Sequence, residues 1–237
     1  MALIVQKFGG SVLNSERKFT KIAHSLACLH RQGHQLVVVV SAIKGMTDRL
    51  LRKAKRMNPY MPEGQSLDLL LSLGEQQSCA LLGLALNACD IPITVKSGAL
   101  VGLHRTRKHQ WHVDVSNYLK ALKKNVVIVS GFQALDEHNH LITLERGGSD
   151  LTALILSHIL KADRCQLIKD VPGIATMDSL CSTQKRTFFT QLSLNDLLTI
   201  SQSGSDVVQA QAIQFAQQYH VNFEVTDLHN HGTYVYA

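Results

Sequence analysis

The sequence predicts an α/β fold, a three-layer αβα sandwich in which helices cover both faces of a mostly parallel sheet. Strand-like and helix-like segments alternate along the 237 residues, as they do in parallel α/β proteins. Several strands are continuous Val/Ile runs, which is typical of strands that are buried on both faces. The composition is that of a folded protein, because 45% of the residues are hydrophobic and only 18% are charged.

Short hydrophobic runs that are rich in β-branched residues mark the strands. We predict strands at residues 3–8, 36–41, 91–95, 126–130, 141–144, 165–168 and 221–226. Longer segments between them have helical character and account for the two outer layers. We predict helices at residues 16–31, 47–57, 67–87, 116–123, 150–161, 194–200 and 207–219, with helix starts at Ser193 and at Ser205-Asp206.

The domain organisation follows from the absence of a long Gly, Ser or Pro linker. Residues 58–64 contain two prolines and a glycine, and they predict a loop between two helices rather than a domain boundary. A polar turn at residues 136–140 separates two hydrophobic strands. We therefore expect one domain of two lobes, residues 1–138 and residues 139–237, with the hinge at this turn.

The charge of +6 favours anionic ligands in general. Residues 49–56 hold five of the cations, and we expect a solvated helix face there, with an acidic or phosphate-bearing partner as the alternative. Aromatic residues are only 5% of the chain, so nucleic-acid binding by stacking is not expected. The five cysteines lack Cys-x-x-Cys spacing, and no signal peptide or membrane span is evident, which favours a reduced cytoplasmic protein.

Two glycine turns carry the predicted chemistry. Lys7-Phe8-Gly9-Gly10-Ser11 follows the first strand, and Arg146-Gly147-Gly148-Ser149-Asp150 lies between a strand and a helix. Glycine lets the backbone approach a ligand closely, and amides at a helix N-terminus favour an anion. Each turn also has a cation beside it. We expect the two turns to converge and to hold a phosphate chain, although tight structural turns are the plainer alternative.

The motifs around these turns resemble those of aspartate kinases, in the same order along the chain. Residues 5–11 are similar to the opening K-F-G-G-T-S, and residues 38–48 resemble V-V-V-S-A-x-x-x-x-T-D. Residues 72–75 resemble S-x-G-E, and residues 142–150 resemble T-T-L-G-R-G-G-S-D, the most specific match. Residues 170–174 and 230–233 resemble D-V-x-G-I and the closing P-G-T. The chain is thus identified as a member of the amino acid kinase superfamily, most similar to the aspartate kinase catalytic domain.

The resemblance implies a role for individual residues. Lys7 would contact the transferring phosphate, and Asp150 would orient Lys7 or the substrate amine. The amino acid would be bound by Ser41, Thr47, Glu75 and Arg146, with Glu75 facing its ammonium group and Arg146 a carboxylate. The nucleotide side would comprise Gly9, Gly10, Ser11, Gly147, Gly148, Ser149, Lys169, Asp170, Ile174 and Asp178.

The implied activity is ATP-dependent formation of an acyl phosphate, with L-aspartate giving 4-phospho-L-aspartate. The resemblance also implies Mg²⁺ carried by ATP oxygens and waters rather than by a dedicated protein metal site, and a homodimer without nucleic-acid or membrane partners. We expect no ACT-type regulatory domain within these 237 residues, and hence no feedback inhibition by that route.

Several positions depart from the family pattern. Ser11-Val12 stands where the family has Thr-Ser, and Leu180 and Asp206 replace an arginine and a lysine of the nucleotide side. Lys169 replaces a threonine and would compensate for one lost cation. Two alternatives therefore stay open: a superfamily kinase for another small carboxylate or phosphate acceptor, and a catalytically impaired subunit that binds nucleotide or amino acid.

Overall fold

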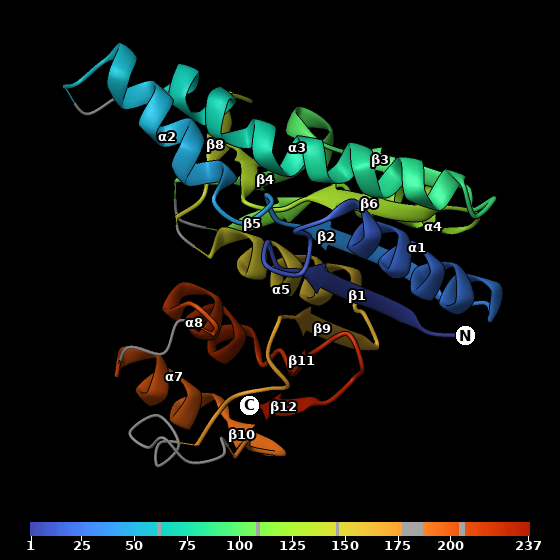
Figure 1. The fold of residues 1–237 in the computed structure, drawn as a ribbon. Coiled ribbons are helices and arrows are strands. Elements are labelled where there is room, and N and C mark those ends of the chain that lie inside the picture. Colours follow the sequence, from blue (N-terminus) through green and yellow to red (C-terminus); the bar gives the residue numbers. More distant parts are fainter. Residues whose placement is uncertain (61–62, 108–109, 146, 177–186, 204–206) are drawn as a thin grey trace.

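A central sheet of eight strands organises the molecule (Figure 1). The computed structural model describes residues 1–60, 63–107, 110–145, 147–176, 187–203 and 207–237. In spatial order the strands are β10 (Gln191–Ser193), β12 (Gly232–Tyr236), β11 (Phe223–Thr226), β9 (Arg164–Ile168), β1 (Leu3–Phe8), β2 (Gln35–Val40), β6 (Val126–Ser130) and β3 (Ile93–Lys96). Neighbouring strands are parallel except for β11 and β12, which are antiparallel.

A second, smaller sheet of four strands lies beside the first. Its order is β5 (Trp111–Val113), β4 (Leu103–Arg105), β7 (Gln133–Leu135) and β8 (Leu141–Thr143). The helices are α1 (Glu16–Arg31), α2 (Met46–Met57), α3 (Gln65–Asn87), α4 (Val115–Leu122), α5 (Gly148–Leu160), α7 (Leu194–Gln202) and α8 (Ala210–Tyr219), with a 3₁₀ turn at Gly98–Val101.

The helices form two layers, one on each face of the main sheet. Alternate residues of β2 point into the two layers, because successive side chains of a strand face opposite ways. Val37 and Val39 join the core that α4, α5, α7 and α8 cover, whereas Val38 and Val40 join the core under α1 and α3. The three-layer architecture and the mostly parallel sheet are therefore confirmed.

Helix α3 is 23 residues long and apolar enough to cross a membrane by length and composition. Its contacts give a different explanation for this character. Leu82 and Leu86 of α3 are fully buried in the core beneath α1, and the helix packs against α1, β3 and β6. Part of the apolar character of α3 is thus explained by the interior of the fold, while Leu69, Leu73 and Leu84 of the same helix are exposed.

The predicted elements are present with small shifts at their ends. The predicted helix at 207–219 begins three residues late, at Ala210, because Gln209 is still extended with φ −75° and ψ 147°. Ser193 caps α7 and its side chain accepts a hydrogen bond from the amide of Asp196, as predicted. The proposed start at Ser205-Asp206 lies outside the described residues.

The polar turn at residues 136–140 joins β7 to β8, which pair with each other. It therefore lies within the small sheet, and the division into lobes at residue 138 stays a prediction.

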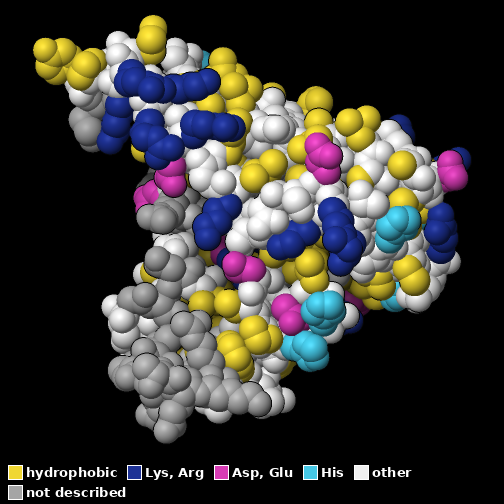
Figure 2. Space-filling model, viewed as in Figure 1, with side chains coloured by type: hydrophobic (Ala, Val, Ile, Leu, Met, Phe, Trp, Pro, Cys, Tyr) yellow, Lys and Arg dark blue, Asp and Glu magenta, His cyan; other side chains and the backbone are white. Residues whose placement is uncertain are grey.

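Figure 2 shows Lys and Arg side chains gathered over α2. Leu50 and Ala54 of α2 are buried, and Leu51 beside them is half-buried.

Candidate active site

The first glycine turn continues β1 at the edge of the sheet where its parallel strands end. The amide of Gly9 donates a hydrogen bond to the carbonyl of Ile168 at 3.0 Å, which ties the turn to the end of β9. Gly10 lies against the segment that follows β2. A Cβ at Gly10 would stand 2.3 Å from the carbonyl oxygen of Ala42, so only glycine allows this approach.

The second glycine turn begins α5. Gly147 is the N-cap residue and has a left-handed backbone with φ 84°, a conformation that glycine adopts without strain. Ser149 and Asp150 follow in the first turn of the helix, and both are buried. Arg146, which we predicted to bind a substrate carboxylate, lies outside the described residues.

The two turns meet at Asp150. The Nζ atom of Lys7 is 2.8 Å from Oδ1 of Asp150, and the Nζ atom of Lys169 is 2.6 Å from Oδ2 of the same carboxylate. Three elements contribute, since Lys7 lies on β1, Asp150 on α5 and Lys169 directly after β9. The expected convergence of the turns is confirmed, and the group carries one net positive charge.

Burial and mutual charge set the protonation of this group. Burial lowers the pKa of Lys7 to about 8; Asp150 opposes this shift and the positive charge of Lys169 adds to it. Burial by itself would raise the pKa of Asp150, but Lys169 and Lys7 outweigh it and hold that pKa below its ordinary value. Asp150 is therefore a fixed anion that orients two ammonium groups rather than a proton acceptor.

A cavity of about 340 Å³ opens beside the first turn. Residues from the predicted nucleotide side line it, namely Lys7, Gly9, Gly10, Ser11, Lys169 and Asp170, together with Val171 and Val207. A Cβ at Gly9 would stand 3.8 Å from both Nζ of Lys7 and Cδ of Lys169. The cavity therefore combines two cations with a turn that has no side chain, a suitable environment for a phosphate group.

Other predicted nucleotide residues are not brought to this cavity. Gly147, Gly148, Ser149 and Ile174 do not line it. Ile174 is a core residue with 1% of its surface exposed, and its amide donates a hydrogen bond to Oγ1 of Thr233. Asp178 lies outside the described residues, as do the departures at Leu180 and Asp206.

Glu75 forms the other side of the candidate site. It is 3% exposed, and its Oε1 atom accepts a hydrogen bond from the amide of Ala42 at 2.9 Å. Its Oε2 atom is buried without a hydrogen-bond partner among the described residues. Burial raises the pKa of Glu75 to about 7, with the Ala42 amide and the charge of Lys7 acting in the opposite direction.

Ser41 and Thr47 are half-buried on either side of Ala42, at the end of β2 and in the first turn of α2. The approach of α3 to this segment is close, since a Cβ at Gly74 would lie 2.6 Å from Cβ of Ala42. The segment from the end of β2 to the start of α2 therefore carries Ser41 and Thr47 and contacts Glu75. The roles of these three residues stay predictions.

Sequence reasoning missed one supporting residue, Gln133. Its side chain is fully buried and accepts hydrogen bonds from the hydroxyl of Ser130 and the amide of Gly98, both at 3.0 Å. It also donates to the carbonyl of Ser72, one helical turn before Glu75. Gln133 thus fixes α3 to the end of β6, and its position directly after the Gly131-Phe132 pair was the available signal.

Comparisons with known proteins identify the family of the chain. The model of the Amino acid kinase family matches residues 2–227. The chain belongs to this family. The aspartate kinase of Pseudomonas fluorescens (strain SBW25) is 37% identical to this amino acid kinase over 232 residues, covering 95% of the chain and 56% of that relative.

Solved structures of other amino acid kinases superpose on the whole chain. The aspartate kinase from Synechocystis gives a TM-score of 0.88 at 36% identity, covering 100% of this chain and 40% of that one. Aspartokinase III of E. coli, solved in complex with aspartate and ADP, gives a TM-score of 0.76 at 20% identity, covering 99% and 64%. The likeness to aspartokinase III shows only that the two chains share a fold. The chain thus spans about half the length of the curated relative.

Proposed function

We propose that the chain is an ATP-dependent kinase that transfers a phosphoryl group to the side-chain carboxylate of L-aspartate and so forms 4-phospho-L-aspartate. The observation that carries the proposal is the Lys7–Asp150–Lys169 group, which joins the two glycine turns beside an open cavity. The similarity to aspartate kinases over 95% of the chain supports the choice of acceptor.

The chemistry suits these residues. A carboxylate with a pKa of about 4 is already ionised at neutral pH, so the acceptor needs no general base. Catalysis then depends on alignment and on neutralising the charge of the transferred group. Lys7 and Lys169 supply positive charge, and Asp150 holds both ammonium groups in place. Lys169 also provides a cation, which would compensate for one of the two that the family pattern has at positions 180 and 206.

Mg²⁺ is the cofactor that this proposal requires. The described residues contain no group of three or more His, Cys, Asp and Glu that could hold a metal ion, and Asp150 is occupied by two lysines. These residues fit an ion that is coordinated mainly by the nucleotide and by water, with Asp170 of the cavity as the residue that would hold it. When bound, the ion would neutralise charge on the phosphates.

The acceptor would be bound around the segment after β2. Glu75 has a free, buried Oε2 atom that suits the ammonium group of an amino acid, and pairing with a cation would favour its ionised form. Ser41 and Thr47 supply hydroxyl groups beside it, and Arg146 would pair with a carboxylate. We further propose that the enzyme is a cytoplasmic homodimer, as the family resemblance implies.

The test is an ADP-release assay with Mg²⁺ and ATP over a panel of amino acids and small phosphorylated acceptors. Turnover with L-aspartate alone is expected. Turnover with another acceptor would favour the alternative superfamily kinase, and calorimetric binding without turnover would favour the impaired subunit. Absence of nucleotide binding in the presence of Mg²⁺ would contradict the kinase proposal as a whole.

Lys7→Ala should lower kcat by about 10²–10³-fold, because a preorganised charge at the transferred group is lost. Asp150 keeps Lys169 as a partner in this variant, so the melting curve should show a folded protein. Lys18→Ala on α1 is the matched control and should retain activity. Full activity of Lys7→Ala would remove Lys7 from the mechanism.

A further inference from the structure

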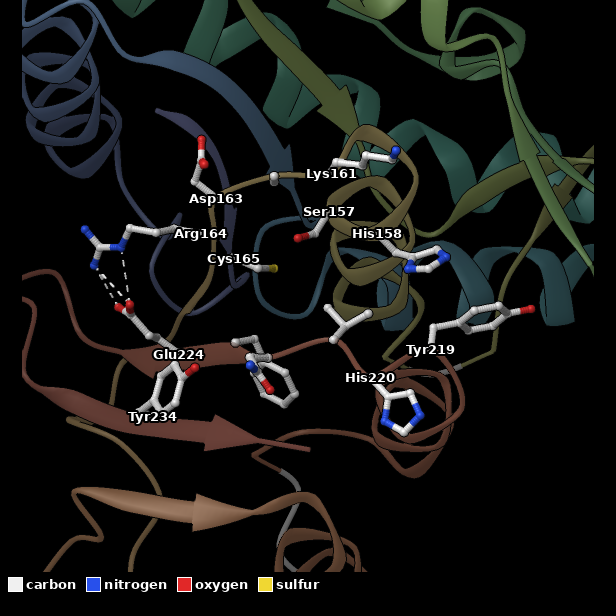
Figure 3. A pocket seen from close by; sticks show the side chains of 14 residues that line it. Ser157, His158, Lys161, Asp163, Arg164, Cys165, Tyr219, His220, Glu224 and Tyr234 are labelled. Atoms are coloured by element: carbon white, nitrogen blue, oxygen red, sulfur yellow. Dashed lines mark hydrogen bonds and ion pairs between the residues drawn. The ribbon is translucent and has the colours of Figure 1, made fainter. Parts of the chain in front are cut away.

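A second cavity, of about 350 Å³, lies at the end of the sheet opposite to the candidate active site (Figure 3). It is bounded by the last turns of α5 and α8, the first residues of β9 and β11, and one residue of β12. Strand β9 begins here at Arg164 and ends just before Lys169. At about 3.3 Å per residue, the two sites are about 17 Å apart.

One of the two carboxylates of this cavity, that of Glu224, is neutralised by a cation of the protein. Glu224 forms a two-pronged ion pair with Arg164, with both of its oxygens 3.0 Å from one guanidinium nitrogen and a further contact at 3.3 Å. The side chain of Gln166 also donates to Glu224. Asp163 accepts a hydrogen bond from the amide of Leu3 at 2.6 Å. Arg164 and Glu224 therefore neutralise each other, whereas Asp163 is held by a single backbone amide.

The basic side chains on the other side of the cavity are not committed. The side chains of His158, Lys161 and His220 have no hydrogen bond or ion pair within the part of the chain that the structure describes. In Figure 3, His158, Tyr219 and His220 lie on the side away from the Arg164–Glu224 pair. The His158 ring is 4.7 Å from the Tyr219 ring, centroid to centroid, so basic groups stand beside an aromatic surface.

The backbone at two of these positions favours glycine, yet the sequence has large side chains there. Lys161 and His220 are the C-cap residues of α5 and α8, and both are left-handed, with φ 54° and φ 52°. Helices commonly end with glycine in this conformation, because a Cβ is strained there. Two separate helices therefore accept strain where their ends carry a basic side chain into one cavity, a pattern that points to function.

We infer that this cavity binds a small organic dianion, either a phosphate monoester or a dicarboxylate. Lys161, His158 and His220 contact its charged groups, and Tyr219 contacts its apolar part. The volume is at the lower end of the range for ligand pockets and suits a small metabolite. A dianion would pair with the ammonium group of Lys161 and accept hydrogen bonds from the rings of His158 and His220, whereas Glu224 is already paired with Arg164.

The test is a titration of the protein, without nucleotide, with glycerol 3-phosphate and with succinate, followed by amide chemical shifts. We expect saturable shifts at residues 158–163 and 219–224. Lys161→Gly and His220→Gly should each weaken binding at least tenfold. Because glycine relieves the left-handed strain, each variant should also melt about 2–4 °C higher than the wild type, so the loss of binding cannot come from unfolding.

Asp90→Gly is the matched control, since Asp90 is also left-handed, with φ 56°, and lines neither cavity. It should melt higher and bind both probes as the wild type does. The inference is overturned if neither probe shifts these amides, or if the shifts occur only around residues 7–11 and 169–171. It is also overturned if the glycine variants bind the probes normally, or if the cationic probe putrescine binds in their place. The phosphate and dicarboxylate probes distinguish the two ligand classes, and none of these readouts depends on kinase activity.

Discussion

Glu75 is the residue whose burial has the clearest energetic consequence. Burial raises its pKa from 4.5 to about 7, so the folded protein binds a proton more tightly than the unfolded chain does. Stability from this group is complete below pH 4.5 and is lost as the pH rises to about 7. Glu75→Gln should therefore be more stable than the wild type at pH 8, by up to about 3 kcal/mol, with no gain below pH 4.5.

Urea unfolding at pH 4.5 and at pH 8 measures this difference, and Glu63→Gln on the exposed α2–α3 connection is the control that should show none. The same Glu75→Gln variant should raise KM for the amino acid, because a neutral amide cannot pair with its ammonium group. Equal stability of variant and wild type at both pH values would contradict the burial argument, and an unchanged KM would separate Glu75 from the acceptor.

At the residue scale, the sequence allowed the prediction of Lys7 and Asp150, because both belong to ordered motifs beside glycine turns. It did not allow the prediction that Lys169 shares Asp150 with Lys7. That contact depends on β9 pairing with β1 and on α5 packing across both. The raised pKa of Glu75 could not be predicted either, because the Ser-Leu-Gly-Glu motif does not show how deeply α3 is buried.

Helix α5 positions Asp150, and its first turn packs against Gly131 at the end of β6. A Cβ at Gly131 would lie 2.6 Å from Cβ of Ser149 and 2.9 Å from its Cα. Gly131→Ala must therefore displace the helix backbone. We expect a loss of about 1–3 kcal/mol in the free energy of unfolding, and a fall in kcat of about tenfold or more because Asp150 moves with the helix.

Gly83→Ala on α3 is the matched control for this substitution. Its Cβ would meet only the end of a flexible side chain, 3.0 Å from Cδ1 of Ile93, and alanine favours a helix. Stability and kcat should change little in Gly83→Ala. If Gly131→Ala lost stability without losing kcat, the first turn of α5 would not control the position of Asp150.

Among the elements, the long helices and the buried Val/Ile strands were predictable, because their hydrophobic patterns are continuous. The three-residue strands β4, β5, β7 and β10 were missed, and so was β12. His104 and His112 face each other in the β4–β5 pair, and such short, polar pairs form through their neighbours rather than through local preference. Helix α8 also starts later than predicted, after the extended Gln209, and Val207 before it lines the cavity beside the first glycine turn.

For the whole molecule, alternation of strands and helices predicted the layers but not the strand order. β1 lies between β2 and β9, so the first strand of the chain is central to the sheet. Its pairing with β9 joins residues about 160 positions apart, such as Ile4 and Arg164. No local pattern specifies a contact of this range, and the order arises from parallel crossover connections.

This central position predicts that the chain unfolds in one cooperative transition, even though we divide it into lobes at residue 138. The main sheet crosses that boundary between β1 and β9, and the small sheet crosses it between β7 and β8. One core cluster also contains Val5 and Val127 from the first part together with Leu154 and Phe223 from the second. Separating the lobes would expose this core.

Differential scanning calorimetry tests the prediction. At about 0.7 kcal/mol per residue, unfolding should absorb roughly 165 kcal/mol per chain near 60 °C, and the van't Hoff enthalpy, fitted with dissociation included if the sample is a dimer, should equal the calorimetric enthalpy. A van't Hoff enthalpy near half of the calorimetric one, or two resolved peaks, would show that the lobes unfold independently. Val5→Ala, at a fully buried position of the shared core, should lower the melting temperature of the whole peak without splitting it, because the residues of both lobes lose the same packing partner.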